Sequence, residues 1–213
     1  LDQRLLASRA SQSRWQMNEL TLDKIVGGFA KVVDAKSPFT HGHSTRVALY
    51  SDLLAEAFGF EDAQRKWLER TALLHDIGKL GISNAILDKP SSLTDDEFAL
   101  MKKHPVYSED VLMRVGAFRP MAKVAVAHHE RLDGKGYPYG INSDDLSLDM
   151  RILTVADVFD ALSAERPYRG ALPLDKTYAI LDDMIGSALD GEVVKCLKDA
   201  IAGAPALNFA QSA

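Results

Sequence analysis

The stretch HHERLDGKGYP, from His128 to Pro138, joins two adjacent histidines to a loop with two glycines and a final proline. A core helix does not need this pair, because adjacent imidazoles rarely both find hydrogen-bond partners in a protein interior. A solvent-exposed loop does not usually carry such a pair either. By itself the pair leaves a structural role and a metal-binding role open. The positions of the other histidines decide between them.

The segments on both sides of this stretch have helical periodicity. Upstream, Pro120 begins a helix whose apolar residues lead directly into His128. Residues 131–147 show no period, and an unstructured stretch of this length in a compact domain is usually functional. A strongly apolar helix is predicted at residues 148–164, and Pro167 ends it.

The rest of the chain also predicts helices, with no strand pattern and no internal repeat. One long helix is marked by Trp15, Leu22, Ile25, Val26, Phe29, Val32 and Val33, which recur on one face at spacings of three and four. Further helices are predicted at 45–58, 62–75, 94–103, 105–115, 174–185 and 192–202, and a loop opens after Gly78. The third of these starts with Thr94-x-x-Glu97, the signature of a capping box. We therefore predict an all-α domain.

Composition limits the class of protein. The chain has 213 residues, of which 46% are hydrophobic and 26% are charged, which is typical of one soluble globular domain. Its net charge of −5 argues against a broad basic face for a nucleic acid polymer. A single cysteine, Cys196, excludes an internal disulfide, fits a reducing compartment and is predicted to be a buried structural thiol.

The ends of the chain differ from its middle. The polar, arginine-containing start is unlike a signal peptide, and no apolar run is long enough to span a membrane. We expect residues 1–20 to be a linker or the end of an upstream signalling helix, 21–204 to be the domain, and 205–213 to be a frayed tail. This predicts a cytoplasmic domain, from a membrane-anchored or receiver-linked protein.

The six histidines carry more information as a set than singly. They are His41, His43, His75, His104, His128 and His129, and each of the last four adjoins a helix end or break. Asp157 lies in the apolar segment LTVADVFDAL, where a buried carboxylate is costly unless it is paired or binds a metal. Asp160 follows one turn later. We favour Asp157 as the ligand and Asp160 as a residue that supports a ligand.

These residues predict a metal site with more than one ion. The proposed ligands are His43, His75, Asp76, His104, His128, His129 and Asp157. This set is too large for one tetrahedral zinc and fits two ions, which Asp76 could bridge. Imidazole-rich ligation favours transition metals over magnesium or calcium; we expect iron or manganese, with nickel or zinc as alternatives. Two metals about 3.5–4 Å apart are the usual apparatus for phosphoester hydrolysis.

Four motifs in order, HDIGK, KKHP, HHERLDGKGYP and VADVFDALSAERPYR, resemble those of the HD-GYP domain, a branch of the HD phosphohydrolases. The likeness covers residues 25–197. It implies an HD-domain helical bundle with a long glycine-rich loop near a centre of two, sometimes three, metals. It also implies hydrolysis of cyclic di-GMP to pGpG, with GMP from a second round, in bacterial second-messenger signalling.

The resemblance implies roles for further residues. Lys79 corresponds to a lysine near the scissile phosphate and, with Asp76, is our catalytic prediction. The residues implied in recognising substrate or partners are Lys79, Arg131, Asp133, Gly134, Tyr137, Arg166 and Arg169. Tyr137 could stack on a guanine or merely pack the loop. Members with a third metal have a glutamate before the first histidine, where this chain has residues 39–42, so we expect two metals and leave a role for His41 open.

Two other functions compete with this one. A non-catalytic signalling module would use the loop to bind a diguanylate cyclase or adaptor protein. A related enzyme would hydrolyse another nucleotide, such as cyclic GMP-AMP or a guanosine polyphosphate. An upstream sensory domain and a homodimer are the other expected partners.

Overall fold

The structure, a computed structural model, describes residues 19–37, 41–165 and 170–203. Its elements are α2 (Glu19–Asp34), α3 (His43–Ala57), α4 (Asp62–Leu74), η1 (Ile77–Gly81), α5 (Asn84–Leu87), α6 (Asp95–Met101), α7 (His104–Arg114), η2 (Arg119–Met121), α8 (Ala122–Val126), η3 (Ala127–His129), α9 (Leu148–Ser163), α10 (Leu174–Met184) and α11 (Gly191–Gly203). No strand occurs in these ranges; a lone bridge joins Ile185 and Leu189. The predicted all-α fold class is confirmed.

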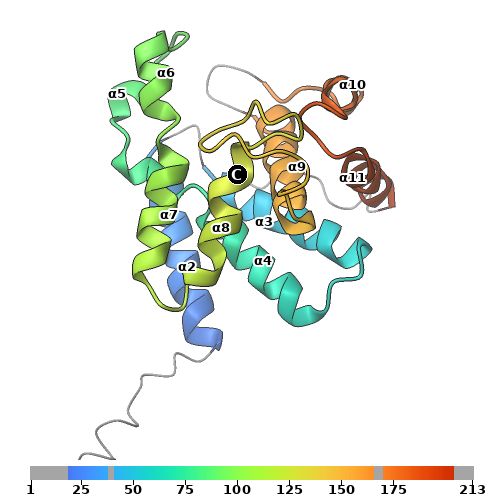
Figure 1. Cartoon of the computed structure of the whole chain (residues 1–213), viewed down its shortest axis with the longest axis horizontal. Helices are drawn as coiled ribbons and strands as arrows, with labels where there is room; N and C mark the ends of the chain where they lie inside the picture. Colours follow the sequence, from blue (N-terminus) through green and yellow to red (C-terminus); the bar gives the residue numbers. More distant parts are fainter. Residues whose placement is uncertain (1–18, 38–40, 166–169, 204–213) are drawn as a thin grey trace, which may run out of the picture.

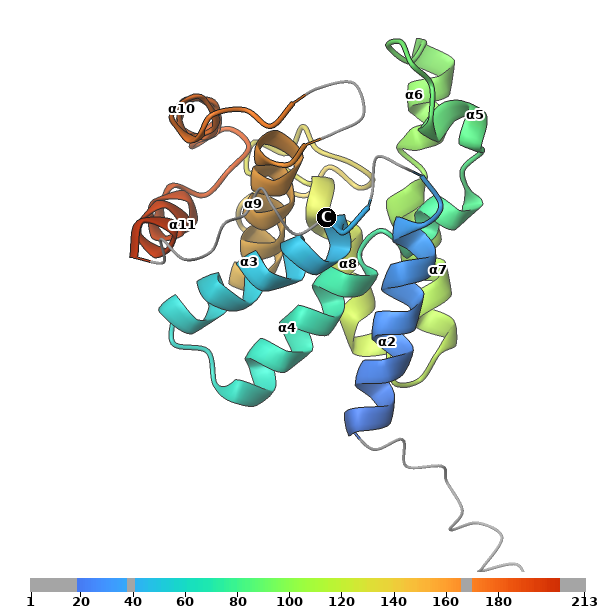
Figure 2. The same cartoon turned by 180° about the vertical axis from the view of Figure 1, so that it is seen from behind.

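Helices α3, α4, α8 and α9 form the middle of the bundle (Figure 1). Helices α10 and α11 lie on one side of it, and α2 and α7 lie on the other. The view from behind shows α2 beside α4 and α7 (Figure 2). Helices α5 and α6 contain no buried residue and project from the body in both views.

Two hydrophobic clusters hold the helices together. The larger joins α3, α4, α9 and α11, and the rings of Tyr50 and Phe159 meet edge to face in it at 4.9 Å. Cys196 packs at its edge and is only half-buried, so the predicted burial of this thiol is incomplete. The smaller cluster joins α2, the end of α4, and the α7–α8 region. Leu74 and Ile77 belong to this cluster, so both sides of the intervening His75–Asp76 dipeptide are fixed in a packed core.

Local signals in the sequence set several helix boundaries. Thr94 accepts a hydrogen bond from the Glu97 amide at 3.3 Å, and Glu97 accepts one from the Thr94 amide at 2.8 Å, which confirms the predicted capping box of α6. Gly59 follows α3 with φ of 74°, a left-handed conformation that glycine tolerates at a helix C-terminus. Pro105 lies in the first turn of α7, as predicted.

Other boundaries differ from the prediction. The helix expected from Pro120 to His129 is divided into η2, α8 and η3, and the loop expected after Gly78 contains η1 and the short α5. On α2, the expected apolar face is only partly buried, because Ile25, Phe29 and Val32 are 37–54% exposed. The smaller cluster covers only part of the apolar face of α2, namely Leu22, Val26 and Val33.

The predicted linker at 1–20 lies almost wholly outside the described residues, as do Trp15, Pro167 and the tail at 205–213. None of the helices in the described part of the chain is both long and apolar enough to cross a membrane.

Candidate metal centre

The fold brings together all seven residues predicted as metal ligands. His43 begins α3, His75 and Asp76 directly follow α4, His104 begins α7, His128 and His129 lie in η3, and Asp157 lies in α9. They form three overlapping groups, and within each group one ligand atom per residue lies within 4.8 Å of the others. All are buried except His129, which is half-buried. Residues from five separate parts of the chain therefore meet at one buried point.

The cluster has two halves with Asp76 between them. The carboxylate half contains His43, His75 and Asp157, and the imidazole half contains His104, His128 and His129. Asp76 Oδ2 lies 3.5 Å from His43 Nε2 and 3.4 Å from His75 Nε2. Its Oδ1 lies 3.2 Å from His104 Nε2 and 3.7 Å from His128 Nε2. Each carboxylate oxygen therefore faces a different half, as a bridging ligand would.

Backbone carbonyl groups fix the orientation of three of the rings. The Nδ1 atoms of His75, His104 and His128 lie 2.7, 2.8 and 2.6 Å from the carbonyl oxygen three residues earlier in the chain. A carbonyl can only accept a hydrogen bond, so Nδ1 carries the proton in each neutral ring and Nε2 carries the lone pair. This is the tautomer in which a histidine binds a metal through Nε2.

These lone pairs converge in the imidazole half. The Nε2 atoms of His104 and His128 are 3.2 Å apart, and both face Asp76 Oδ1. Burial and the neighbouring imidazoles hold the pKa of His128 well below its ordinary value, so this ring is neutral near pH 7. His75 Nε2 and Asp76 Oδ1 are buried and have no hydrogen-bond partner among the described residues. Acceptors that face one another repel, and a cation between them removes the repulsion; the residues therefore fit a metal.

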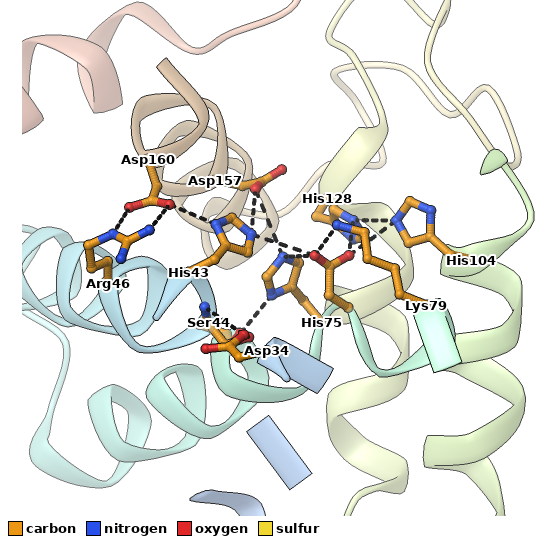
Figure 3. Close-up of polar contacts among 12 residues, drawn as sticks. Asp34, His43, Ser44, Arg46, His75, Lys79, His104, His128, Asp157 and Asp160 are labelled. Carbon is orange, nitrogen blue, oxygen red and sulfur yellow. Dashed lines mark hydrogen bonds and ion pairs between the residues drawn. The ribbon is translucent and has the colours of Figure 1, made fainter. Parts of the chain in front are cut away.

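The carboxylate half is more strongly charged. His43 Nε2 lies 3.3 Å from Asp157 Oδ1, and its Nδ1 lies 2.7 Å from Asp160 Oδ2 (Figure 3). Burial acts to raise the pKa of Asp157, but the hydrogen bond with His43 and the nearby imidazoles outweigh burial and lower it far below its ordinary value. Asp157 thus faces the cluster, whereas Asp160 lies behind His43, in the arrangement that we favoured.

Arg46 extends this arrangement away from the cluster. Its guanidinium donates to both oxygens of Asp160, from Nε at 2.6 Å and from Nη2 at 3.1 Å (Figure 3). A planar guanidinium fits a carboxylate in this two-bond geometry. Arg46 therefore fixes Asp160, which in turn fixes the ring of His43.

A close approach of backbones places His104 beside Asp76. A Cβ atom on Gly78 would lie 2.0 Å from the carbonyl oxygen of His104 and 2.4 Å from the amide nitrogen of Ser108, so only glycine allows this contact. The Gly78 amide donates to Ser108 Oγ at 2.9 Å, and Ser108 Oγ donates to the carbonyl of His75 at 2.7 Å. The start of α7 is thereby held against the HDIG turn.

Two other predicted residues lie at the cluster. The ammonium group of Lys79 contacts Asp76 Oδ2, and its side chain is 19% exposed, so it borders both the cluster and solvent. The ring of Tyr137 stacks on the ring of His129, with centroids 4.7 Å apart and planes inclined by 29°. One face of Tyr137 is therefore covered by an imidazole.

The remaining predicted residues are not brought into the cluster. Arg131 and Asp133 bind each other through two hydrogen bonds of 3.0 and 2.8 Å at the loop surface. Gly134 lies in the turn between Asp133 and Tyr137 and has φ of 70°, a left-handed conformation that favours glycine. His41 is exposed. Arg166 and Arg169 lie outside the described residues, so their predicted roles stay predictions.

Three residues at the site were missed by the sequence reasoning. Arg46 follows His43 by three residues, a spacing that puts both on one helix face and could have revealed the link. Glu130 lies inside the segment His128–Pro138, but nothing in that segment indicates what its side chain binds. Ser108 has no sequence signal, because only the tertiary approach of α7 to Gly78 gives it a function.

Comparisons with known proteins agree with this geometry. The family described as HD domain matches residues 29–193. A Vibrio cholerae protein named 3′3′-cGAMP-specific phosphodiesterase 3 is 50% identical over 201 residues, which cover 94% of this chain and 44% of the relative. The cyclic di-GMP phosphodiesterase response regulator RpfG of Xanthomonas campestris is 36% identical, over 92% of this chain and 51% of its own. The chain thus spans about half the length of these relatives.

A comparison with solved structures also finds a phosphodiesterase. The crystal structure of a cyclic GMP-AMP-specific phosphodiesterase of V. cholerae matches with a TM-score of 0.57 and 47% identity, over 87% of this chain and 42% of that one. The matched family region contains all seven clustered residues and the four ordered motifs. The chain therefore belongs to the HD domain family, and its motifs are those of the HD-GYP branch.

Proposed function

We propose that this chain is a metal-dependent phosphodiesterase domain that hydrolyses cyclic dinucleotides. The observation that carries the proposal is the position of Asp76, whose two carboxylate oxygens face separate sets of imidazole nitrogens. Two sets of ligands that share one carboxylate suit a pair of cations. Relatives named as phosphodiesterases of 3′3′-cGAMP and of cyclic di-GMP support the reaction class.

The two halves would each hold one divalent transition metal. Asp76 would be shared, and Asp157 would be the second carboxylate ligand. Imidazole ligands favour iron, manganese, nickel or zinc, and we propose iron or manganese first. Bound together, the two ions supply positive charge for phosphate oxygens and make water a stronger nucleophile at neutral pH.

The chain's own residues would handle the substrate. Water adds to phosphorus and the bond from phosphorus to the 3′ oxygen breaks. The 3′ oxygen leaves with a proton as a hydroxyl, and the product is a linear dinucleotide with a 5′-phosphate. Lys79 borders both the cluster and solvent, so its ammonium can donate to a phosphate oxygen or to the leaving oxygen. Arg131, Asp133, Gly134 and Tyr137 stay proposed contacts for the substrate or a partner, as do Arg166 and Arg169.

The substrate itself is a choice between two molecules. The sequence motifs led us to cyclic di-GMP, with pGpG and then GMP as products. The 50% identity to a protein named as specific for 3′3′-cGAMP favours that substrate as the second candidate. Both molecules carry the same diester ring and at least one guanine, so the proposed chemistry is the same and only base recognition differs.

The test is hydrolysis by this chain, purified without oxygen and loaded separately with iron, manganese, nickel or zinc. Cyclic di-GMP, 3′3′-cGAMP and a guanosine polyphosphate are offered in parallel, and products are separated by chromatography. We expect a linear dinucleotide from one or both cyclic substrates, and none from the Asp76→Ala variant. Failure of every metal with both cyclic dinucleotides would contradict the proposal.

The same variant separates an enzyme from a docking module. If the domain only binds a diguanylate cyclase or an adaptor through its glycine-rich loop, Asp76→Ala should leave that binding intact and there should be no turnover to lose. We also propose that the domain works in a cytoplasmic protein with an upstream sensory segment. The relative named as a response regulator, of which this chain matches 51%, supports this arrangement.

A further inference from the structure

The histidines of the cluster differ in what holds their rings. Backbone carbonyls fix Nδ1 of His75, His104 and His128, and Asp160 fixes Nδ1 of His43. The ring of His129 makes no hydrogen bond to any residue that the structure describes, and it is half-buried. Contact with the stacked ring of Tyr137 takes the place of that bond. The orientation of His129 therefore depends on where the loop puts Tyr137.

The backbone holds Tyr137 from one side. The Tyr137 amide donates to the carbonyl oxygen of His129 at 3.1 Å. A Cβ atom on the preceding Gly136 would lie 2.5 Å from Glu130 Cα and 2.6 Å from the Arg131 amide nitrogen, so only glycine allows the loop to fold back this closely. The hydrogen bond and the close approach together fix the backbone of Gly136 and Tyr137 against His129 and Glu130.

The side chain of Glu130 holds the segment from the other side. It is 2% exposed, and its Oε1 accepts hydrogen bonds from the Tyr139 amide at 2.7 Å and from the Gly140 amide at 3.2 Å. These amides follow Tyr137 by two and three residues. A buried acceptor that satisfies two loop amides is costly to remove, because the amides lose their partner. Glu130 thus links the residue after His129 to the chain just beyond Tyr137.

We propose that Glu130 is a positioning residue for the imidazole half of the cluster. By binding the Tyr139 and Gly140 amides, Glu130 keeps the ring of Tyr137 against the ring of His129. The position of Tyr137 in turn sets the orientation of the His129 ring, so that one of its nitrogens points toward His104 and His128. The inference rests on the proposed use of this half as a metal site. It does not depend on which substrate the domain hydrolyses.

The test compares three variants by cobalt titration of the metal-free chain, followed by visible absorption. Glu130→Leu removes the acceptor, Glu130→Gln keeps an oxygen that can accept both bonds, and Asp145→Asn changes an exposed carboxylate of the same loop. His129→Ala identifies the absorption component of the imidazole half. We expect Glu130→Leu to weaken one site about 10–100-fold, with loss of the component that His129→Ala loses, because residues that support ligands have effects of this size. Glu130→Gln should recover most of the affinity, and Asp145→Asn should match the wild type.

A second pair of variants tests the path through Tyr137. Tyr137→Leu should reproduce the cobalt titration of Glu130→Leu, and the double variant should be no weaker than either single variant, because both changes release the same contact. Equal weakening of both sites, or wild-type affinity in Glu130→Leu, would overturn the proposal. If Glu130→Leu lacks the helical circular dichroism of the wild type, Tyr137→Leu decides: selective weakening supports the proposal, and any other result overturns it. An inactive wild-type chain would count against the proposed function alone, since no dinucleotide is used here.

Discussion

The two halves of the cluster use the same ring chemistry with different partners. In the carboxylate half, His43 lies between Asp157 and Asp160, and Arg46 fixes the second of these carboxylates. The imidazole half contains three histidines, and among the described residues only one carboxylate oxygen, Asp76 Oδ1, lies within 4 Å of their ring nitrogens. A cation in the carboxylate half would be attracted by Asp157 as well as by the shared charge of Asp76, whereas one in the imidazole half would have only the shared charge and would otherwise depend on the direction of neutral lone pairs.

The halves also differ in how the fold supports them. In the carboxylate half, Asp157 lies within α9 and His43 begins α3, and both of these long helices belong to the larger core. His104, His128 and His129 lie at helix ends, where backbone carbonyls, a glycine contact and the loop provide the support. We infer that the imidazole half is the more sensitive of the two to backbone changes at a distance from its ligands, and that the carboxylate half is the more sensitive to loss of charge.

The largest effect is expected where the halves meet. Asp76→Asn removes the negative charge that both halves share, so we expect a loss of at least about 100-fold in metal affinity at both sites, more than a supporting residue would cause, and loss of hydrolysis. Metal content after dialysis and cobalt titration measure this. Asp144→Asn, an exposed carboxylate in the loop, is the control. Survival of one site at wild-type affinity would show that Asp76 serves only the other half.

The next largest effect is expected from a backbone change that should affect the metal affinity of the two halves unequally. In Gly78→Ala the new Cβ meets backbone atoms of α7 at 2.0 and 2.4 Å, so α7 must move and take His104 with it. We expect the free energy of unfolding to fall by about 1–3 kcal/mol and the imidazole half to lose affinity before the carboxylate half does. Urea unfolding and cobalt titration check both. Gly116→Ala is the matched control, because nothing lies within 4 Å of its Cβ position, and it should change stability by less than about 0.5 kcal/mol.

The sequence allowed prediction of the parts whose chemistry is local. Helical periodicity gave most of the helices, and the capping box at Thr94 gave the start of α6. The candidate ligands, which the fold brings together, could be named because imidazoles and buried carboxylates have few other uses at helix ends and in apolar helices. Asp157 and Asp160 could be singled out for the same reason, since both lie in one strongly apolar segment.

Contacts between distant segments could not be predicted in this way. Ser108 binds the Gly78 amide only because α7 packs on the HDIG turn, and nothing around Ser108 in the chain indicates it. The exposure of Ile25, Phe29 and Val32 depends on how much of α2 its neighbours cover, which periodicity does not give. Glu130 was visible in the motif, but its role appears only when the loop returns to bring two amides to its carboxylate.

A smaller effect, with the reverse selectivity between the two halves, is expected from a change to Asp160, which lies behind His43. Asp160→Asn keeps the size of the side chain but weakens the hold on His43 Nδ1 and leaves Arg46 opposite a neutral group. We expect about 10–100-fold weaker metal binding in the carboxylate half, with the imidazole half unchanged. The cobalt titration that resolves the two absorption components measures both affinities in one experiment. A loss confined to the imidazole half would reverse our assignment of Asp160.

The smallest effect should come from Tyr137→Phe, which separates the ring of this residue from its hydroxyl. The ring stacks on His129, whereas the hydroxyl makes no hydrogen bond to a residue that the structure describes. Phenylalanine keeps the stacked surface, so metal affinity in both halves and KM for the cyclic dinucleotide should stay within about twofold of the wild type. A loss of about 1.4 kcal/mol in binding free energy would instead change the affinity tenfold. Steady-state kinetics and cobalt titration together make the comparison. A rise in KM with unchanged metal affinity would assign the hydroxyl to substrate binding, and Tyr137 would then act on the nucleotide as well as on the imidazole half.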